Sequence, residues 1–254
     1  TKISGRDRSN CPGKLYVVGI GPGAADEISQ NALNVLKSAE TIVGYKLYID
    51  LIADIVKNKR IIASTMRKEI ERVQLAIQEA QSGKTVCSIS SGDPGVYGMA
   101  GLVLEMVSKE NLSLPVEIIP GIPAANAAAA VLGAPLMHDY AVISLSDLLT
   151  PWEIIEKRVE CASEADFVIV LYNPKSSQRD WQIEKTANII LQHKSPSTPV
   201  GIVKDASREG ESVVITTLDK MTSCPIDMTT IIIIGNSTTF IYHNYMVTKR
   251  GYQL

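Results

Sequence analysis

Three times along this chain, a short apolar run leads into a loop of glycine and proline and then into a segment with helical spacing. The loops are residues 19–24, 91–98 and 120–125. Short apolar runs bounded by Gly and Pro are typical of buried strands, and apolar residues three or four positions apart are typical of helices. A strand, a glycine loop and a helix in repeated succession predict an α/β fold with a parallel sheet.

The expected elements follow from this periodicity. In the first half we expect four strands in a βαβαβαβ series: Leu15–Gly19, Thr41–Tyr45, Thr85–Ile89 and Val116–Ile119. An amphipathic helix is expected over 64–82. In the second half we expect the strands 140–145, 167–172, 200–203, 212–217 and 230–235 and the helices 151–162 and 180–192. The turn at 204–211 is too short for a crossover helix, which predicts antiparallel strands in a mixed second sheet.

The length of 254 residues is compatible with one large domain or two smaller ones. The loop at Pro120 separates the parallel half from the less regular half. We therefore expect a flexible tail at residues 1–13, a first α/β domain at 14–120 and a second α/β domain at 121–254.

Composition excludes several classes of function. A net charge of −2 with 20% charged residues lacks the basic excess of a nucleic-acid-binding surface. No apolar run reaches the roughly 20 residues of a membrane span, and residues 1–13 lack the apolar core of a signal peptide. The four cysteines contain no CxxC pair, which argues against a zinc site or a disulfide framework. We expect a cytoplasmic protein that binds no metal, no nucleic acid and no membrane.

The loop at 91–98 is a candidate ligand site. It reads Ser-Gly-Asp-Pro-Gly-Val-Tyr-Gly and follows an expected strand. In open α/β sheets, ligands bind beyond the carboxyl ends of strands, where glycines allow backbone amides to come close. Asp93 is therefore a candidate for ligand contact. The alternative is that Asp93, Pro94 and Gly95 form only a surface turn, for which this composition is common.

The loop at 19–24 matches the G-x-G-x-x-G/A pattern of dinucleotide-binding proteins. The match lacks the acidic residue that should follow the second strand, because Lys46 and Leu47 stand there. Pro22 also removes an amide from a loop whose amides should face the pyrophosphate. An NAD(P)-dependent oxidoreductase is thus a remote alternative.

Polar clusters follow three expected strands of the second half, at 172–177, 204–208 and 235–237. Their recurrence at strand ends predicts one composite site. Cations near these clusters and after the second strand can pair with ligand carboxylates, although any one of them can equally be a solvated surface charge. The candidate substrate-binding residues are Lys46, Lys175, Lys204 and Arg208.

Four motifs in this order resemble the tetrapyrrole (corrin/porphyrin) methylase family, over a region from Lys14 to the C-terminus. They are Val-Gly-Ile-Gly-Pro-Gly (18–23), Ser-Gly-Asp-Pro-Gly-Val-Tyr-Gly (91–98), Ile-Ile-Pro-Gly-Ile-Pro-Ala-Ala (118–125) and Ile-Gly-Asn-Ser (234–237). Within the family, the segments 43–46, 138–147, 171–176 and 247–252 are similar to the precorrin-3B C-17 methyltransferases of cobalamin biosynthesis.

The resemblance implies two α/β domains with a cofactor cleft between them, S-adenosyl-L-methionine (SAM) as cofactor, S-adenosyl-L-homocysteine (SAH) as product, and a homodimer. It also implies a set of cofactor-binding residues: Pro22, Gly92, Asp93, Val96, Tyr97, Gly98, Pro123, Ala124, Tyr172, Asn173 and Ala206. Pro123 is a departure, because many relatives have Ser or Thr there. Extended relatives carry an iron–sulfur segment after the methylase core, which this chain is expected to lack.

The implied reaction is methyl transfer to carbon 17 of precorrin-3B or cobalt-factor III, coupled to ring contraction. A sulfonium donor needs no activating base, so alignment of the methyl group with the ring carbon can supply much of the catalysis. Ring contraction moves a proton, and His138, Asp139 and Asp147 are the candidate catalytic residues, with a purely structural role open for each. Two alternatives are a sister enzyme that methylates another ring position, such as the precorrin-4 C-11 enzyme, and a tetrapyrrole carrier without catalytic activity.

Overall fold

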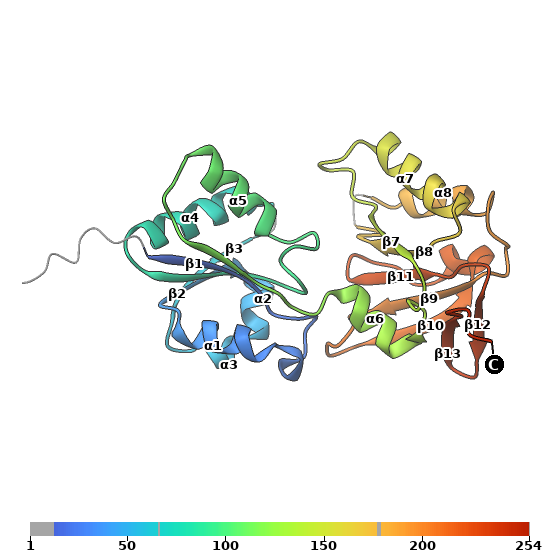
Figure 1. The fold of residues 1–254 in the computed structure, drawn as a ribbon, viewed down its shortest axis with the longest axis horizontal. Coiled ribbons are helices and arrows are strands. Elements are labelled where there is room, and N and C mark those ends of the chain that lie inside the picture. Colours follow the sequence, from blue (N-terminus) through green and yellow to red (C-terminus); the bar gives the residue numbers. More distant parts are fainter. Residues whose placement is uncertain (1–12, 66, 177–178, 254) are drawn as a thin grey trace, which may run out of the picture. The chain divides into compact units, whose positions relative to one another are not determined.

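The computed structural model describes residues 13–65, 67–176 and 179–253. The chain forms two compact units, one ending at Pro123 and the other beginning at Ala124, whereas the sequence places the boundary at residue 120. Each unit contains its own central sheet (Figure 1). The expected tail at 1–13 lies outside the described residues except for Gly13.

The first unit is built on a five-stranded sheet with the strand order β3-β2-β4-β1-β5. Its strands are β1 (Lys14–Gly19), β2 (Thr41–Tyr45), β3 (Arg60–Ser64), β4 (Thr85–Ser90) and β5 (Val116–Ile119). Its helices are η1 (Ala25–Glu27), α1 (Gln30–Ser38), α2 (Lys46–Leu51), α3 (Ala53–Val56), α4 (Glu69–Gln81) and α5 (Ala100–Lys109). All neighbouring strands are parallel, which confirms the predicted parallel sheet. Every strand therefore ends at the same edge of the sheet.

Helices cover both faces of this sheet. Helices α1, α2 and α3 pack on one face, and α4 and α5 pack on the other (Figure 1). Side chains alternate along β4, so that Cys87 and Ile89 face the first group of helices and Val86 faces the second. Burial on both faces explains why the central strands are continuous apolar runs in the sequence.

Residues 46–68 differ from the sequence prediction. The helix expected over 64–82 begins only at Glu69, because Arg60–Ser64 forms the edge strand β3 beside β2. Several side chains of β3 are exposed, so the strand lacks the buried apolar run by which its neighbours are recognised. The short helices α2 and α3, between β2 and β3, were not predicted either.

The second unit contains a five-stranded mixed sheet with the order β10-β9-β11-β8-β7 and a three-stranded sheet with the order β12-β13-β6. Its strands are β6 (Gly133–Ala134), β7 (Tyr140–Ser144), β8 (Val168–Tyr172), β9 (Pro199–Lys204), β10 (Ser212–Thr217), β11 (Thr230–Ile234), β12 (Thr239–Tyr242) and β13 (Tyr245–Thr248). Its helices are α6 (Ala124–Leu132), α7 (Trp152–Glu164), α8 (Gln182–Ile190) and η2 (Leu218–Ser223). Strand β10 is antiparallel to β9, as predicted.

Strand direction decides which loops of the second unit lie together. Strands β7 and β8 are parallel, and β11 is antiparallel to both β8 and β9. Strand β9 therefore points the same way as β7 and β8. The loops after β7, β8 and β9 leave the sheet at one edge, and the loop after β11 leaves it at the opposite edge.

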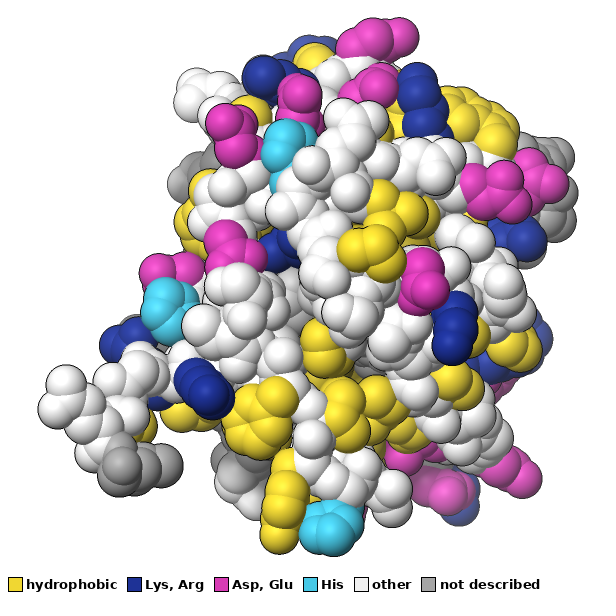
Figure 2. Space-filling view, turned by 90° about the vertical axis from the view of Figure 1, so that its right-hand side faces the viewer, with side chains coloured by type: hydrophobic (Ala, Val, Ile, Leu, Met, Phe, Trp, Pro, Cys, Tyr) yellow, Lys and Arg dark blue, Asp and Glu magenta, His cyan; other side chains and the backbone are white. Residues whose placement is uncertain are grey.

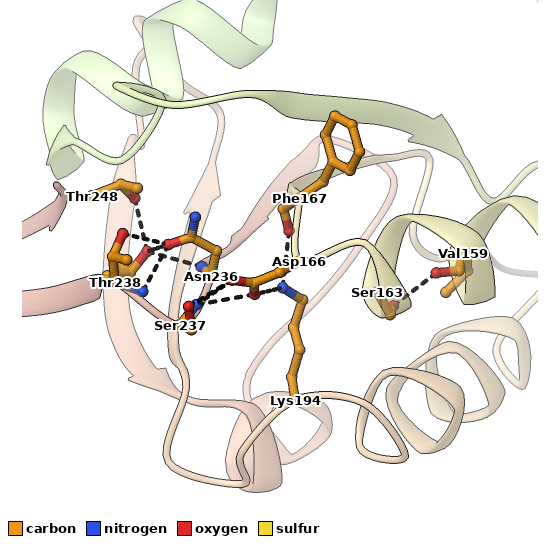
Figure 3. A network of polar contacts seen from close by, with 10 residues as sticks. Val159, Ser163, Asp166, Phe167, Lys194, Asn236, Ser237, Thr238 and Thr248 are labelled. Atoms are coloured by element: carbon orange, nitrogen blue, oxygen red, sulfur yellow. Dashed lines mark hydrogen bonds and ion pairs between the residues drawn. The ribbon is translucent and has the colours of Figure 1, made fainter. Parts of the chain in front are cut away.

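That opposite edge carries the polar cluster at 235–237. The backbone N–H of Ser237 donates to Asp166 Oδ1 at 3.0 Å and its hydroxyl donates to Asp166 Oδ2 at 2.6 Å. The Lys194 ammonium donates to Asp166 Oδ1 at 3.0 Å and to the carbonyl oxygen of Phe167 at 2.9 Å (Figure 3). The expected composite site is therefore wrong for 235–237, because these residues tie together loops at the far end of the sheet.

Strands β12 and β13 form an antiparallel hairpin with an exposed apolar surface. Phe240, Ile241, Tyr242 and Tyr245 are all exposed large hydrophobic residues. Hydrophobic side chains also gather in the lower part of the face that Figure 2 shows. Successive side chains of a strand point to opposite faces, and Tyr242 pairs with Tyr245, so Phe240, Tyr242 and Tyr245 form an exposed apolar strip on one face of this hairpin.

Candidate functional site

Three glycine-rich loops leave the first sheet from neighbouring strands. Strand β1 lies between β4 and β5, so the loops after β4 (91–98), β1 (20–24) and β5 (120–123) are adjacent. They lie at the carboxyl edge of a parallel sheet, where α/β proteins bind their ligands. This edge is the candidate site of the first unit.

Glycines let these loops pack against one another. The Gly92 N–H donates to the Gly21 carbonyl at 2.7 Å, and the Gly21 N–H donates to the Gly92 carbonyl at 3.2 Å. Both residues have positive φ, of 74° for Gly21 and 65° for Gly92. A Cβ atom on Gly19 would lie 2.6 Å from the Gly92 carbonyl oxygen, and one on Gly121 would lie closer still. The three loops thus form one backbone cluster that leaves no room for side chains at its contacts.

Asp93 uses both carboxylate oxygens inside this cluster. Its Oδ1 accepts a hydrogen bond from the Gly95 N–H at 2.7 Å, and its Oδ2 accepts one from the Gly121 N–H at 3.1 Å. The first bond closes the Asp-Pro-Gly turn, and the second joins the loop after β4 to the loop after β5. The turn that the sequence offered as the alternative is therefore present, and Asp93 also connects two loops of the candidate site.

The other predicted cofactor residues of the first unit lie in the same loops. Pro22 is buried, and Val96 and Pro123 are half-buried. Tyr97 has φ 54° and is 56% exposed, so the backbone turns there and leaves its ring at the surface. A Cβ atom on Gly98 would lie 2.6 Å from the Pro94 carbonyl oxygen. A residue larger than glycine is thus excluded at the point where the loop enters α5.

In the second unit, Tyr172 joins strand β8 to helix α6. The Tyr172 hydroxyl accepts a hydrogen bond from the Ala125 N–H at 2.9 Å, in the first turn of the helix that begins at Ala124. Tyr172 is the last residue of β8. The predicted residues Ala124 and Tyr172 are thereby brought together at the carboxyl edge of β8.

Asn173 and Ala206 lie at the same edge. Asn173 has φ 51°, and its Nδ2 donates to Ser144 Oγ, at the end of β7, at 2.9 Å. Ala206 follows β9 and is buried between Asp205 and Ser207, which both have positive φ. Since the Ala206 side chain packs into the core, any contact from this position to a ligand would come from its backbone.

Arg179 holds the loops after β7 and β8 together, a role the sequence did not indicate. Its Nη1 donates to the carbonyl oxygens of Leu145 at 3.0 Å and Asn173 at 3.1 Å. Its Nε lies 3.9 Å from Asp147 Oδ1, and the Gln182 amide donates to Asp147 Oδ2 at 3.0 Å. Both carboxylate oxygens of Asp147 therefore face donors from the second unit itself.

The three candidate catalytic residues are not brought together. His138 and Asp139 immediately precede β7, and the Val168 N–H at the start of β8 donates to the Asp139 carbonyl at 3.2 Å. They therefore lie at the amino edge of this strand pair, whereas Asp147 follows β7 at the carboxyl edge. His138 Nδ1 accepts a hydrogen bond from the Asp139 N–H at 2.9 Å. Among the three, Asp147 alone lies on the edge that carries Tyr172 and Asn173.

The four candidate substrate cations differ in their present partners. Lys46 pairs with Asp50 at 2.9 Å on the exposed surface of α2. Lys204 pairs with Asp227 at 2.8 Å, and the hydrogen bond that its ammonium donates to this carboxylate raises the pKa of Lys204. Lys175 and Arg208 follow β8 and β9, on the edge that carries Asn173 and Ala206. Lys175 and Arg208 thus lie on the same edge as these candidate cofactor residues. Ser177, the last residue of the polar cluster at 172–177, lies outside the described residues.

The described ranges contain neither a cluster of metal-ligating side chains nor a helix that could span a membrane. Within residues 13–65, 67–176 and 179–253, there is no group of three or more His, Cys, Asp or Glu side chains arranged to hold a metal ion. No helix in these ranges has the length and apolar character to cross a membrane.

The chain has a parallel α/β unit with three interlocked glycine loops, followed by a mixed-sheet unit with polar loops at one edge. These features are typical of α/β proteins that bind small organic ligands. Residues 14–222 match the family model of Tetrapyrrole (Corrin/Porphyrin) Methylases. The chain belongs to this family. Membership gives no support to the oxidoreductase alternative.

The chain is similar to several named methyltransferases. The chain is 51% identical over 240 residues to a "Probable cobalt-factor III C(17)-methyltransferase" of Salmonella typhimurium strain LT2, covering 94% of this chain and 100% of that protein. It is 50% identical over 245 residues to a "Cobalt-factor III methyltransferase" of Priestia megaterium, covering 95% of this chain but only 45% of that protein. A crystal structure of the methyltransferase CobJ matches with a TM-score of 0.88 and 33% identity, over 93% of this chain and 100% of that one.

Proposed function

We propose that this chain is a methyltransferase that uses SAM to methylate carbon 17 of cobalt-factor III or precorrin-3B, with contraction of the macrocycle, in cobalamin biosynthesis. The observation that carries the proposal is the 51% identity to the Salmonella protein, because it extends over the whole length of that protein. The Salmonella and Priestia proteins, which are 51% and 50% identical to this chain, are both named for cobalt-factor III. We therefore favour cobalt-factor III over precorrin-3B as the substrate.

The residues at the carboxyl edge of the first unit fit SAM. Gly92, Gly95 and Gly98 place backbone without side chains in the loop after β4, which is what close approach to a ligand requires. Asp93 has two oxygens with about four acceptor positions and uses two of them on backbone N–H groups, so it can also accept from a ligand hydroxyl or ammonium. We propose that Pro22, Gly92, Asp93, Val96, Tyr97, Gly98 and Pro123 contact the cofactor from this unit.

Residues of the second unit complete the proposed set. Ala124, Tyr172, Asn173 and Ala206 share one edge of the mixed sheet, where hydrogen bonds fix Tyr172 and Asn173 and burial fixes Ala206. Fixed groups lose little conformational freedom when a ligand binds. We propose that Tyr172, Asn173 and Ala206 bind the adenine end of SAM and that Ala124 lies near its carboxylate end, with Lys175 and Arg208 nearby for substrate carboxylates.

For methyl transfer, the main task of the protein is to align the methyl group of SAM with the ring carbon. SAM supplies a methyl group on a sulfonium, an electrophile that a ring carbon attacks without a general base. The protein then contributes by holding the two partners in line, which can account for a large part of a rate enhancement. The interlocked loops at Gly21, Gly92 and Gly121 suit this task, because their hydrogen bonds and close contacts leave them little freedom to move.

Ring contraction needs a proton to move, and Asp147 is the candidate that lies on the appropriate edge of its unit. Gln182 and Arg179 hold its carboxylate in place. Replacing Asp147 with Asn keeps the shape and removes the base. We expect the variant to bind SAH normally and to accumulate methylated product in which the ring is not contracted. Normal ring contraction by this variant would remove Asp147 from the mechanism and leave His138 and Asp139 to be tested.

In the deciding experiment, the purified protein is incubated with SAM that carries a labelled methyl group. The second substrate is either cobalt-factor III or precorrin-3B. Mass spectrometry then detects methylation, and NMR locates the new methyl group. Methylation at carbon 17 of the cobalt substrate is the expected result. Methylation at carbon 11 would favour the sister enzyme, and tetrapyrrole binding without methyl transfer would favour a carrier.

The proposal includes a cytoplasmic homodimer. The apolar strip of Phe240, Tyr242 and Tyr245 supports association of two copies, because exposed strips of this kind are commonly interaction surfaces. Light scattering coupled to gel filtration should give twice the monomer mass. Replacing Phe240 and Tyr242 with Ser should give the monomer mass, and a monomeric unmodified protein would refute the dimer.

A further inference from the structure

Arg72 is a buried arginine on α4 with only neutral partners. The residue is 4% exposed. Its Nε donates to Ser64 Oγ at 2.6 Å, its Nη2 donates to the Thr65 carbonyl at 3.0 Å, and its Nη1 donates to Met99 Sδ at 3.4 Å. The guanidinium carbon lies 5.9 Å from the centre of the Tyr45 ring. These groups satisfy part of its hydrogen-bonding capacity, but none of them carries a negative charge.

Acidic side chains on the same helix are engaged elsewhere. Glu71 pairs with Lys68, and Glu79 pairs with Arg60 and Lys84. Across the described ranges, no carboxylate forms an ion pair with Arg72. Lys194, the other basic residue buried in those ranges, does have a carboxylate partner, at 3.0 Å.

A buried cation without a counter-charge is costly. Moving a charged group out of water costs several kcal/mol, and the cost is recovered only with a well-placed partner of opposite charge. A guanidinium keeps its charge inside proteins and matches the two oxygens of a carboxylate. Arg72 therefore has the properties of one half of an ion pair whose other half is not part of the described chain.

The position of Arg72 indicates where that other half comes from. Its neighbours Tyr45 and Ser64 are the last residues of β2 and β3, and Met99 follows the glycine loop after β4. These strands are adjacent in the order β3-β2-β4, so Arg72 lies over the carboxyl edge of the first sheet. This is the edge that carries the candidate cofactor loops.

We propose that Arg72 binds a carboxylate of a ligand at this edge. The inference rests on the proposed function, which offers two sources: the single carboxylate of SAM and the carboxylates around the rim of the tetrapyrrole. Either one would turn a buried isolated charge into a bidentate ion pair.

Met99 is the partner that the ligand carboxylate displaces. A thioether sulfur is a weak hydrogen-bond acceptor. Breaking the hydrogen bond from Arg72 Nη1 to the Met99 sulfur therefore costs little free energy. Methionine has three rotatable side-chain bonds and adapts easily to new surroundings, and Met99 is only half-buried. Movement of the Met99 side chain would thus open Nη1 to the ligand, while Ser64 and Thr65 continue to hold Nε and Nη2.

The test replaces Arg72 with Met, which keeps the apolar stem and removes the charge. Calorimetry measures binding of SAH and of decarboxylated SAH, and steady-state kinetics at saturating SAM measure KM for cobalt-factor III. Arg158→Met, an exposed position on α7, is the matched control. If Arg72 binds the SAM carboxylate, R72M weakens SAH at least tenfold and leaves decarboxylated SAH within twofold. If it binds the tetrapyrrole, SAH affinity stays within twofold and KM rises at least tenfold.

Two outcomes overturn the inference. One is that R72M changes neither SAH affinity nor KM by more than twofold, which would make Arg72 a structural support. The other is that R72M weakens SAH and decarboxylated SAH equally, which would mean that the loops collapse. If R72M does not fold, R72K, which keeps the charge but cannot form the bidentate pair, is measured in the same way. Failure of the unmodified protein to bind SAH or the tetrapyrrole would instead count against the proposed function.

Discussion

Replacing Asp93 with Ala should weaken SAH binding by a definite amount that follows from its two hydrogen bonds. Both carboxylate oxygens accept from backbone N–H groups, Gly95 at 2.7 Å and Gly121 at 3.1 Å. Hydrogen bonds to charged groups contribute about 1.5–3 kcal/mol each, and we take about 1 kcal/mol for each of these because Asp93 is half-buried. If SAH binds only the ordered loops, the loss of about 2 kcal/mol raises its Kd roughly 30-fold.

Asp93→Asn separates the two bonds. The asparagine oxygen can still accept from Gly95, but its amide group would then face the Gly121 N–H, donor against donor. We expect loss of about 1 kcal/mol and a Kd for SAH raised roughly fivefold. Glu105→Ala, an exposed carboxylate position on α5, serves as the control and should bind SAH like the unmodified protein.

Isothermal titration of SAH into the three variants and the unmodified protein, with thermal unfolding of each, checks these values. A graded series, with D93N between the unmodified protein and D93A, is the expected result. Equal affinity in D93A and the unmodified protein would refute the view that Asp93 orders the loops for binding. Loss of more than a thousandfold in D93A would exceed what loop ordering can account for, and would assign most of the effect to the proposed direct contact between Asp93 and the cofactor.

Three further outcomes follow from other parts of the molecule. Gly121→Ala should abolish SAH binding, because a Cβ atom at this position would collide with the Gly92 carbonyl oxygen and lie 2.9 Å from the carbonyl carbon of Gly19. The control is Gly101→Ala, whose Cβ atom would have no neighbour within 4 Å. This control should bind SAH normally and be slightly more stable in thermal unfolding. Burial alone would raise the pKa of Asp166, but the hydrogen bonds from Ser237 and Lys194 outweigh it and hold the pKa below its ordinary value. Asp166 should therefore stabilise the fold above about pH 4 and lose this effect as the pH falls through its lowered pKa, so acid unfolding of Asp166→Asn should be less steep with pH than that of the unmodified protein. Burial raises the pKa of Cys87 to about 12, so iodoacetamide at pH 8 should label the exposed Cys161 and leave Cys87 unlabelled by mass spectrometry unless the protein is unfolded.

The parallel sheet and its ligand edge could be predicted from sequence because each rests on local signals. Apolar runs mark strands buried on both faces, and a glycine loop after such a run lies at the carboxyl edge whatever the rest of the fold is. Asp93 was identified in this way. What it bonds to was not predictable, since Gly121 is far from it in the chain and reaches it only because β1 lies between β4 and β5.

Strand direction was the main source of error in the second unit. The polar clusters at 172–177 and 235–237 both follow apolar strands, but β8 and β11 are antiparallel. Their ends therefore lie at opposite edges, and no local pattern in either strand reveals this. The edge strand β3 was missed for a different reason: exposed side chains gave it no buried apolar run.

The motif Ile-Gly-Asn-Ser at 234–237 makes structural contacts at the far edge of the mixed sheet. Asp166 has φ 56°, a strained value for a residue other than glycine, and it accepts from Ser237 and from the buried Lys194 (Figure 3). The contacts among Asp166, Lys194 and Ser237 offset both the backbone strain at Asp166 and the burial of the Lys194 ammonium. The motif therefore holds together the loops at the far edge of the mixed sheet. Arg72 is the opposite case: no motif marks it, yet its buried charge has no counterpart in the described chain. A charge completed within its own unit points to a structural role, and a charge left incomplete at a ligand edge points to binding.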